Sequence, residues 1–576
     1  MSQLRALKAA EQAALEARCC FADDWTKVRV SECFSVAQLS MSRFGGSVEI
    51  HAGARVHNST VVNYSLGEGS LVDRVSLLEC SGSSSFGNGV KVASLNECGG
   101  RAIKIYDTMS AQVAYIATLY RHRPLVVERI EAMVDALCEQ RRSSMGSVGA
   151  CSKVIAAGII RDVRIASNVT IEGASSLSNG TLLEGSYFGA DVKAHDFIAV
   201  EASRVDGGAS IERCFVGERV ILSSGFTALD SLFFSMSHCE NGEAVSVFAA
   251  PFTVSHHKSS LLIAGMFSFF NAGSGSNQSN HLFKCGPVHQ GVHMRGCKFG
   301  SSAYVMLPAV DGAYTTVIGS HNSHHDTSAF PFSYLINKDG RSTLIPASNI
   351  SSYGYMRDVE KWKRRDVREV KRDIINFEEH NPYITGMVIE ALNISNSLME
   401  KSSEAQSYVH NNVVISANNL RRGLTLYNKF VAGSLGAMLS YGGTKHLCEG
   451  RSKWVDLAGQ YITSSAVEEL LSDIESGEIS TLAAIDEQLQ AFANEYESYA
   501  ADWAMGTLQQ MLGRVPSPDM IEEMIAGAAK AREELKSMAL RDMKRDLSES
   551  MAVSYGIDSD DKQDKIADYN AVRGVN

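Results

Sequence analysis

The chain has 576 residues, a formal net charge of −11 and a hydrophobic fraction of 45%. This length corresponds to roughly three to four domains of about 150 residues, and the composition excludes wholesale disorder. The acidic balance disfavours a nucleic-acid-binding protein, because such proteins usually carry a basic face. No apolar run reaches the roughly 18 residues that a membrane span requires, and residues 1–20 lack the apolar centre of a secretory signal. We therefore expect a cytoplasmic protein with no membrane span and no nucleic-acid partner.

The sequence divides into three regions. Residues 1–33 predict a helix and a lead-in, because Leu and Ala recur at helical spacing in the first 20 residues. Residues 34–350 are rich in Gly, Ser, Val and Ile and poor in long helical patterns. Residues 351–576 are mostly helical and contain a basic run, 364–372, which is either a solvated face or a surface for an anionic ligand or acidic partner. We expect this helical region to cap the preceding domain, which would otherwise expose an unpaired row of strands.

A six-residue spacing of apolar residues runs through the middle region, beginning with Leu66, Val72 and Leu78. Neither a strand, with period two, nor a helix, with period 3.6, explains this spacing. It predicts a solenoid in which each side of a coil is a short strand followed by a tight turn. Three such sides make a coil of about 18 residues, and glycine at the corners tolerates positive φ. The longest unbroken run of this spacing consists of Ile165, Ile171, Leu177 and Leu183.

The six-residue pattern resembles that of the hexapeptide-repeat superfamily, whose fold is the left-handed parallel β-helix. The resemblance implies such a helix over residues 34–350, and the alternative is an ordinary β-sandwich. Residues 103–148 interrupt the pattern with apolar residues at helical spacing, which predicts two helices joined near Pro124. This insertion is either an arm that projects from one corner of the coil or a helical hairpin that only packs.

Histidine is concentrated in one part of the chain, since nine of the 16 histidines lie between His238 and His325. The densest polar segments are 271–298 and 319–334. Polar side chains at this density are either solvated or assembled around something polar. Three hypotheses follow: acyl transfer, a metal site and non-catalytic binding.

The first hypothesis is acyl transfer, in which a neutral histidine takes a proton from an amine or hydroxyl as it attacks a thioester. The segment SNHLFKCG (279–286) resembles the stretch around the catalytic histidine of the bifunctional bacterial acetyltransferase/uridylyltransferase for glucosamine 1-phosphate. The resemblance implies His281 as general base, acyl-CoA as co-substrate and a sugar or nucleotide sugar as acceptor. His289 and His293 are the alternative bases. The expected substrate-binding residues are Asn277, Asn280 and Gln290, together with Lys284 and Arg295 for phosphate.

The second hypothesis is a divalent-metal site. His321, His324, His325 and Asp326 offer imidazole and carboxylate groups at close spacing, which suits Zn²⁺, Mn²⁺ or Fe²⁺. His321 and His325 are four residues apart, as in the HExxH motif, but Asn322 stands where the glutamate base would be. The alternative is a set of hydrogen-bonded or exposed histidines on a polar loop.

The third hypothesis is a non-catalytic solenoid that binds a sugar phosphate or a partner protein. Asn, Gln, His and aromatic side chains in 269–304 suit hydroxyl groups and sugar rings, and the stretch GSGSNQSN (273–280) can present backbone N–H groups to an anion. That stretch matches neither the P-loop nor the dinucleotide fingerprint.

Three segments carry a resemblance over the whole chain: NAGSGSNQSNHLFKCGPVHQG (271–291), GSHNSHHDTSAFPFSYL (319–335) and WVDLAGQYI (454–462). They resemble an uncharacterised bacterial family, best known from Bacteroidetes and spirochaetes, that joins an N-terminal left-handed β-helix to a C-terminal helical part. The resemblance implies distant kinship with trimeric acyltransferases and nucleotide-sugar enzymes, but no established reaction. A homo-oligomer is expected, a trimer by this analogy or a dimer through the helical region.

Overall fold

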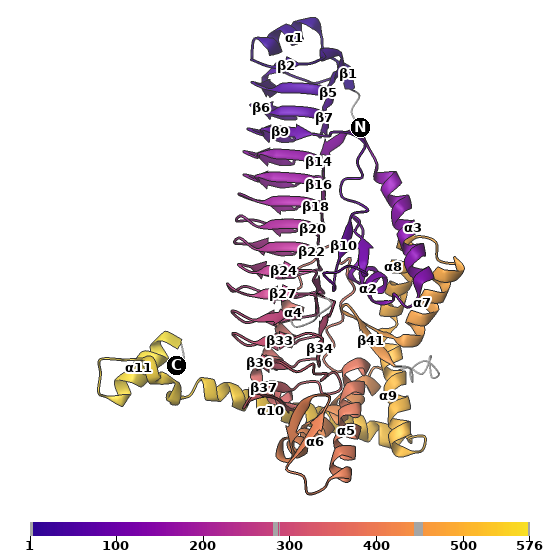
Figure 1. Ribbon diagram of the computed structural model, residues 1–576, viewed down its shortest axis with the longest axis vertical. Coiled ribbons are helices and arrows are strands. Elements are labelled where there is room, and N and C mark those ends of the chain that lie inside the picture. The colour runs from indigo at the N-terminus through magenta and orange to yellow at the C-terminus, as the bar shows by residue number, and fades with distance from the viewer. Residues whose placement is uncertain (1–3, 280–285, 287, 443–452, 574–576) are drawn as a thin grey trace.

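The computed structural model describes residues 4–279, 286, 288–442 and 453–573. It is a long β-solenoid with a helical region gathered beside and beneath its C-terminal end (Figure 1). At the N-terminal end lie β1 (Leu4–Ala6), α1 (Ala9–Glu16), β2 (Phe21–Ala22), η1 (Trp25–Lys27), β3 (Val28–Ser31) and η2 (Val36–Gln38). No helix in the described part of the chain has the length and hydropathy that crossing a bilayer requires.

Each coil of the solenoid has three sides. The first two are joined in the long strands β5 (Arg43–Ile50), β7 (Thr60–Leu66), β14 (Ile159–Ile165), β16 (Ser176–Leu182), β18 (Lys193–Ala199), β20 (Ser210–Val216) and β22 (Thr227–Phe233). Elsewhere these sides are separate strands: β9 (Leu77–Glu79), β12 (Gly146–Val148), β24 (Glu243–Val245), β25 (Phe248–Ala249), β27 (Leu261–Ile263), β28 (Gly265–Phe267), β30 (Asn277–Ser279), β31 (Gly291–His293), β33 (Tyr304–Met306), β34 (Ala309–Asp311) and β36 (Ser320–His321).

The third side is a separate parallel stack of short strands. Its members are β4 (Leu39–Ser40), β6 (Arg55–His57), β8 (Leu71–Asp73), β13 (Lys153–Ile155), β15 (Thr170–Glu172), β17 (Tyr187–Phe188), β19 (Arg204–Val205), β21 (Ile221–Ser223), β23 (His238–Glu240), β26 (Val254–Ser255), β29 (Asn271–Ala272), β32 (Lys298–Phe299), β35 (Thr316–Ile318) and β37 (Tyr334–Lys338). We call this stack the third side throughout.

The regular coils are 17 residues long, one fewer than the coil of 18 that the sequence predicts. Lys153 pairs with Thr170, Thr170 with Tyr187 and Tyr187 with Arg204, each 17 residues further along. The inward-facing side chains explain the difference, because they advance by five, six and six residues. One such series of buried residues is Leu177, Leu182, Phe188, Ala194, Ala199, Val205, Ile211, Val216 and Leu222.

The corner inside each long strand accounts for the shortened side. Its residue has a φ between 47° and 54° in five successive coils, and three of the five are aspartate. Asp and Asn adopt this left-handed conformation more readily than other residues with a side chain. The five corner residues are Asp162, Asn179, Asp196, Arg213 and Asp230.

The glycines of the solenoid have two roles. Positive φ, the predicted role, is found at Gly53, Gly87 and Gly173. Gly67 and Gly217 do not have a positive φ; a Cβ on either would lie 2.8 Å from backbone atoms of the neighbouring coil, so these two are required because the coils approach each other closely. The apolar ladder itself is confirmed, since Leu66, Val72 and Leu78 are fully buried.

The chain leaves the solenoid after β9 and returns at β12, which pairs with β7. The intervening insertion contains β10 (Lys91–Ala93), β11 (Ala102–Lys104), α2 (Ala111–Leu119) and α3 (Pro124–Arg141). It follows the outside of the solenoid: the N–H of Ala93 donates to Asp230 at 3.2 Å, and that of Leu95 to the carbonyl of Ser246 at 2.7 Å. Within the insertion, β10 therefore lies against the solenoid, whereas α3 packs against α7 of the C-terminal region (Figure 1).

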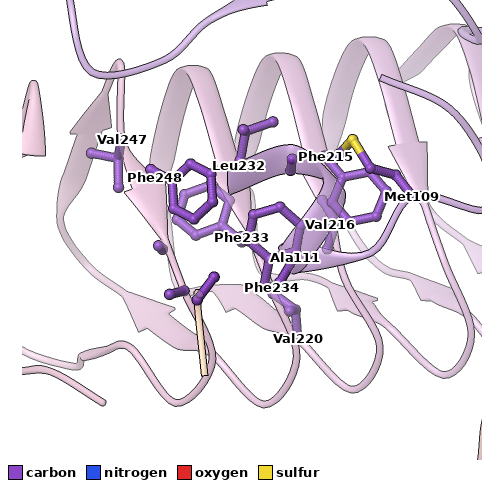
Figure 2. Packing of buried hydrophobic residues seen from close by; sticks show 14 of the residues in the cluster. Met109, Ala111, Phe215, Val216, Val220, Leu232, Phe233, Phe234, Val247 and Phe248 are labelled. Atoms are coloured by element: carbon purple, nitrogen blue, oxygen red, sulfur yellow. The ribbon is translucent and has the colours of Figure 1, made fainter. Parts of the chain in front are cut away.

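An apolar column on the outside of the solenoid explains where the insertion docks. Ile198, Phe215, Leu232 and Phe248 are register partners in successive coils, and all four are buried. Met109 and residues at the start of α2 pack over this part of the solenoid (Figure 2). Burying a side chain of this size stabilises a fold by about 1.5–3 kcal/mol, so the column is a substantial anchor.

The helical region continues from the last coil. After β38 (Arg341–Ile345) and η3 (Ser348–Ser351) come α4 (Tyr353–Arg365), α5 (Pro382–Lys401), β39 (Ser407–His410), β40 (Val413–Ser416), α6 (Ala417–Leu439), β41 (Trp454–Leu457), β42 (Gln460–Thr463), α7 (Ser464–Ser476), α8 (Leu482–Asn494), α9 (Tyr496–Leu512), α10 (Pro518–Asp546), η4 (Glu549–Ser554) and α11 (Lys562–Arg573). β38 pairs with β37, and Tyr427 of α6 donates to the carbonyl of Pro331 at 2.7 Å. The end of the solenoid is thus covered, as the sequence predicts.

The segment between α4 and α5 crosses the solenoid and joins it to the insertion. Glu218 accepts three backbone N–H groups of residues 369–371 at 2.7–2.9 Å. Asp373 accepts the N–H of Ala111 at 2.8 Å and the N–H of Ser235 at 2.9 Å. One buried carboxylate therefore holds together a coil, the insertion and the C-terminal region.

Candidate metal centre

Three residues of the acyl-transfer hypothesis, Asn280, His281 and Lys284, lie outside the described residues, so that role of His281 stays a prediction. His289 and Gln290 are half-buried. Asn277 is half-buried on β30, and its amide donates to the carbonyl of Gly275 at 3.4 Å.

Arg295, the expected phosphate ligand, is buried between the solenoid and the helical region. Its guanidinium carbon lies 3.9 Å from the ring centroid of Phe269 and 4.5 Å from that of Tyr461. It also contacts the carboxylate of Asp456 at 3.3 Å and donates to the carbonyl of Asn376. These partners engage the guanidinium within the chain and give it a role in holding the two regions together.

His293, an alternative base, belongs to a buried group with Asp311 and His325. Its Nδ1 lies 2.7 Å from one oxygen of Asp311, and Nε2 of His325 lies 2.9 Å from the other. The ring of His293 stacks on Phe267 at a centroid distance of 4.9 Å. All three polar side chains are buried in the solenoid. We call them the inner group.

The inner group is arranged around a negative charge. Burial alone raises the pKa of Asp311, but the two imidazoles outweigh it and hold that pKa well below its usual value. Burial alone lowers the pKa of His325, but the Asp311 carboxylate outweighs it and the pKa is raised. Burial lowers the pKa of neighbouring His321 to about 4, so His321 is neutral at pH 7. The group therefore has the charges of a buried ion pair within the core.

The metal ligands predicted from sequence are not assembled as a set. His321 faces His325 with 5.8 Å between ring centroids, but its Nδ1 lies 2.9 Å from the hydroxyl of Ser342. His324 is exposed, and Asp326 accepts the N–H of Ser328 at 2.9 Å. In the part of the chain that the structure describes, these four residues do not provide three ligand atoms close enough together to hold an ion.

A different set of two histidines and a carboxylate does meet that requirement. Ligand atoms of His238, Glu240 and His256 all lie within 4.8 Å of one another, and the three side chains are half-buried. We call them the outer group. Strand geometry explains their position, because alternate side chains of β23 point to the same face and Cys239 between them points into the core. Cys239 pairs with Ser255, so continuing the register places Glu240 beside His256.

The hydrogen bonds and charges of the outer group favour ligation at neutral pH. Nε2 of His238 lies 2.9 Å from Glu240, which also accepts the hydroxyl of Ser223 at 3.1 Å. The hydrogen bond from His238 lowers the pKa of Glu240, so the carboxylate is ionised. Burial and then the nearby His238 lower the pKa of His256, so its imidazole is neutral. Metal ions bind these two protonation states.

The sequence contains a signal for this group. His238 and Glu240 form a His-x-Glu pair on a predicted side of the coil, and His256 follows 16 residues after Glu240, about one coil later. Density of polar residues draws attention to 271–298 and 319–334 instead, although His238 and His256 are among the nine clustered histidines. A search of the sequence for histidine and acidic residues about one coil apart would have identified the outer group.

Comparison with known proteins identifies the family but no activity. A model described as "Domain of unknown function (DUF4954)" matches residues 54–399. The chain belongs to the DUF4954 family. The match covers most of the solenoid, the insertion, α4 and nearly all of α5, and includes both histidine groups of this DUF4954 protein. A second model, "Domain of unknown function (DUF6819)", matches residues 444–576, a range that includes β41 to α11.

A relative of this DUF4954 protein is an uncharacterized protein of Treponema pallidum (strain Nichols). The two are 23% identical over 434 residues, which is 66% of this chain and 59% of the relative. The chain thus spans about three fifths of the length of the relative it matches.

Proposed function

We propose that this protein binds a divalent transition-metal ion at the outer group. The observation that carries the proposal is the convergence of ligand atoms from His238, Glu240 and His256 within 4.8 Å. Two imidazoles and a carboxylate on one face of the ion leave further coordination positions open. Zn²⁺, Mn²⁺ and Fe²⁺ suit this ligand set.

The number of protein ligands in the outer group favours a reactive metal site over a purely structural one. A structural zinc site is usually closed by four protein ligands, whereas here three protein ligands leave the ion open to an oxygen ligand. The charge of Arg365, at the end of α4, is one of the influences that lower the pKa of His256, so a cation lies near the group. An ion here would act as a Lewis acid toward an oxygen of a bound anionic molecule.

The test is the metal content of the purified protein. After dialysis against Zn²⁺, Mn²⁺ or, without oxygen, Fe²⁺, the parent should retain one ion per chain, measured by mass spectrometry of the elements. His256→Ala should lose it. His257→Ala changes the adjacent, exposed histidine and should retain it.

His324→Ala separates the two metal hypotheses, because His324 belongs only to the set predicted from sequence. Retention of the ion by this variant supports the outer group. Absence of a stoichiometric ion in the parent, or its loss in His324→Ala but not in His256→Ala, would contradict the proposal.

A further inference from the structure

A polar groove of about 520 Å³ lies at the C-terminal end of the solenoid. The solenoid contributes Tyr334 of β37, and η3 contributes Ser348 and Ser351. The opposite wall comes from α6, with Asn419, and from α10. The volume is within the range of sites that hold small molecules.

Three guanidinium groups give the groove a positive charge. Arg541 and Arg545 are four residues apart on α10, so they lie on one face of the helix, and Arg422 comes from α6. Among the described residues, these three guanidinium groups form no ion pair with a carboxylate within 4.0 Å. Nε of Arg541 donates to the backbone carbonyl of Ser537 at 3.3 Å. Asp542 contributes a carboxylate to the lining and accepts the N–H of Tyr353 at 3.1 Å.

The mixture of groups points to a ligand with both a phosphate and hydroxyl groups. Arginine recognises phosphate through paired N–H donors. Asp542 would repel a ligand that carried only negative charge, but it can accept a hydrogen bond from a ligand hydroxyl. Ser348, Ser351 and Asn419 add neutral donors and acceptors, and the ring of Tyr334 adds an apolar surface.

We propose that this groove binds a phosphorylated sugar or a similar phosphorylated polyol, with Arg422 and Arg541 holding the phosphate. The site is distinct from the outer group and from Lys284 and Arg295, which the sequence analysis assigned to phosphate. It does not depend on the metal proposal, because the groove and the outer group share no residue.

The test uses isothermal titration of the full chain with glucose 1-phosphate, glucose and inorganic phosphate. We expect glucose 1-phosphate to bind more tightly than either of the others, and the binding to weaken as sodium chloride rises from 50 to 500 mM. Arg422→Gln and Arg541→Gln should each weaken it at least tenfold. Arg421→Gln and Lys544→Gln, exposed neighbours on the same two helices that do not line the groove, should leave it unchanged.

Three results would overturn the proposal: no binding of glucose 1-phosphate by the parent at millimolar concentration, equal binding by the parent and both groove variants, or equal binding of inorganic phosphate and glucose 1-phosphate. Far-ultraviolet circular dichroism of each variant confirms that it is folded. The substituted side chains are solvent-accessible, so the fold should tolerate glutamine at these positions.

Discussion

The inner and outer groups contain the same chemical components, two histidines and one carboxylate, but they lie on opposite sides of the solenoid wall. In the outer group the side chains are half-buried and their ligand atoms converge. In the inner group both oxygens of Asp311 are occupied by imidazoles, and the three residues are buried. The comparison shows what the direction of the side chains decides. Histidines and a carboxylate that point out of the solenoid can receive a ligand, whereas those that point into it form part of the core.

The largest expected loss of stability comes from substitutions in the inner group. Asp311→Ala should destabilise the protein by about 3–5 kcal/mol, because it leaves a buried cation without its partner. Asp311→Asn should cost less, because the amide can accept from one imidazole and donate to the other. Chemical unfolding followed by circular dichroism measures both changes. Equal stability of the parent and Asp311→Ala would show that the inner group is not an ion pair.

The second largest effect on the free energy of unfolding is expected from the titration of His321. The pKa of folded His321 is about 4, and that of an unfolded histidine is about 6.5. As pH falls below 6.5 the unfolded chain takes up a proton that the folded chain does not, so stability decreases. This one residue should cost the parent about 2 kcal/mol between pH 7.5 and 5.

The stability advantage of the parent over His321→Asn should shrink by that amount across this range. A constant difference between the parent and His321→Asn would place the titration of His321 at its ordinary pH.

In the absence of metal, the smallest effect on stability is expected at the outer group. Without added metal, Glu240→Gln should change the free energy of unfolding by less than about 1 kcal/mol, because its hydrogen bond with His238 is partly exposed. In the presence of metal at 100 times its dissociation constant, the parent should gain about 2.7 kcal/mol and the variant much less. Equal stabilisation of both by metal would place the ion elsewhere.

The solenoid could be predicted from sequence because each coil repeats the same physical requirement. One apolar residue per side fills a narrow core, and Leu66, Val72 and Leu78 show this directly. The predicted coil was one residue too long. The aspartates and asparagine at the strand corners shorten one side from six residues to five, and a pattern of apolar residues does not include them.

The site was harder to predict, because it depends on which residues meet between coils. His238 and His256 are separated by a whole coil in sequence, and a local count of polar residues does not connect them. Arg295 shows the converse: a basic residue in a polar segment suggests phosphate binding, but its ion-pair partner, Asp456, lies 161 residues further on. No local pattern contains such a pairing.

The hydrogen bond between Ala111 and Asp373 has a consequence for synthesis of the chain. The two residues are 262 positions apart, so a ribosome takes on the order of tens of seconds to travel from one to the other. During that time the coils can stack as they emerge, but the insertion lacks the carboxylate that anchors α2. A chain that ends before residue 373 therefore holds its insertion by the apolar column and by hydrogen bonds such as those of Ala93 and Leu95. The segment between α4 and α5 thus completes the contacts of α2 only after residue 373 has been synthesised.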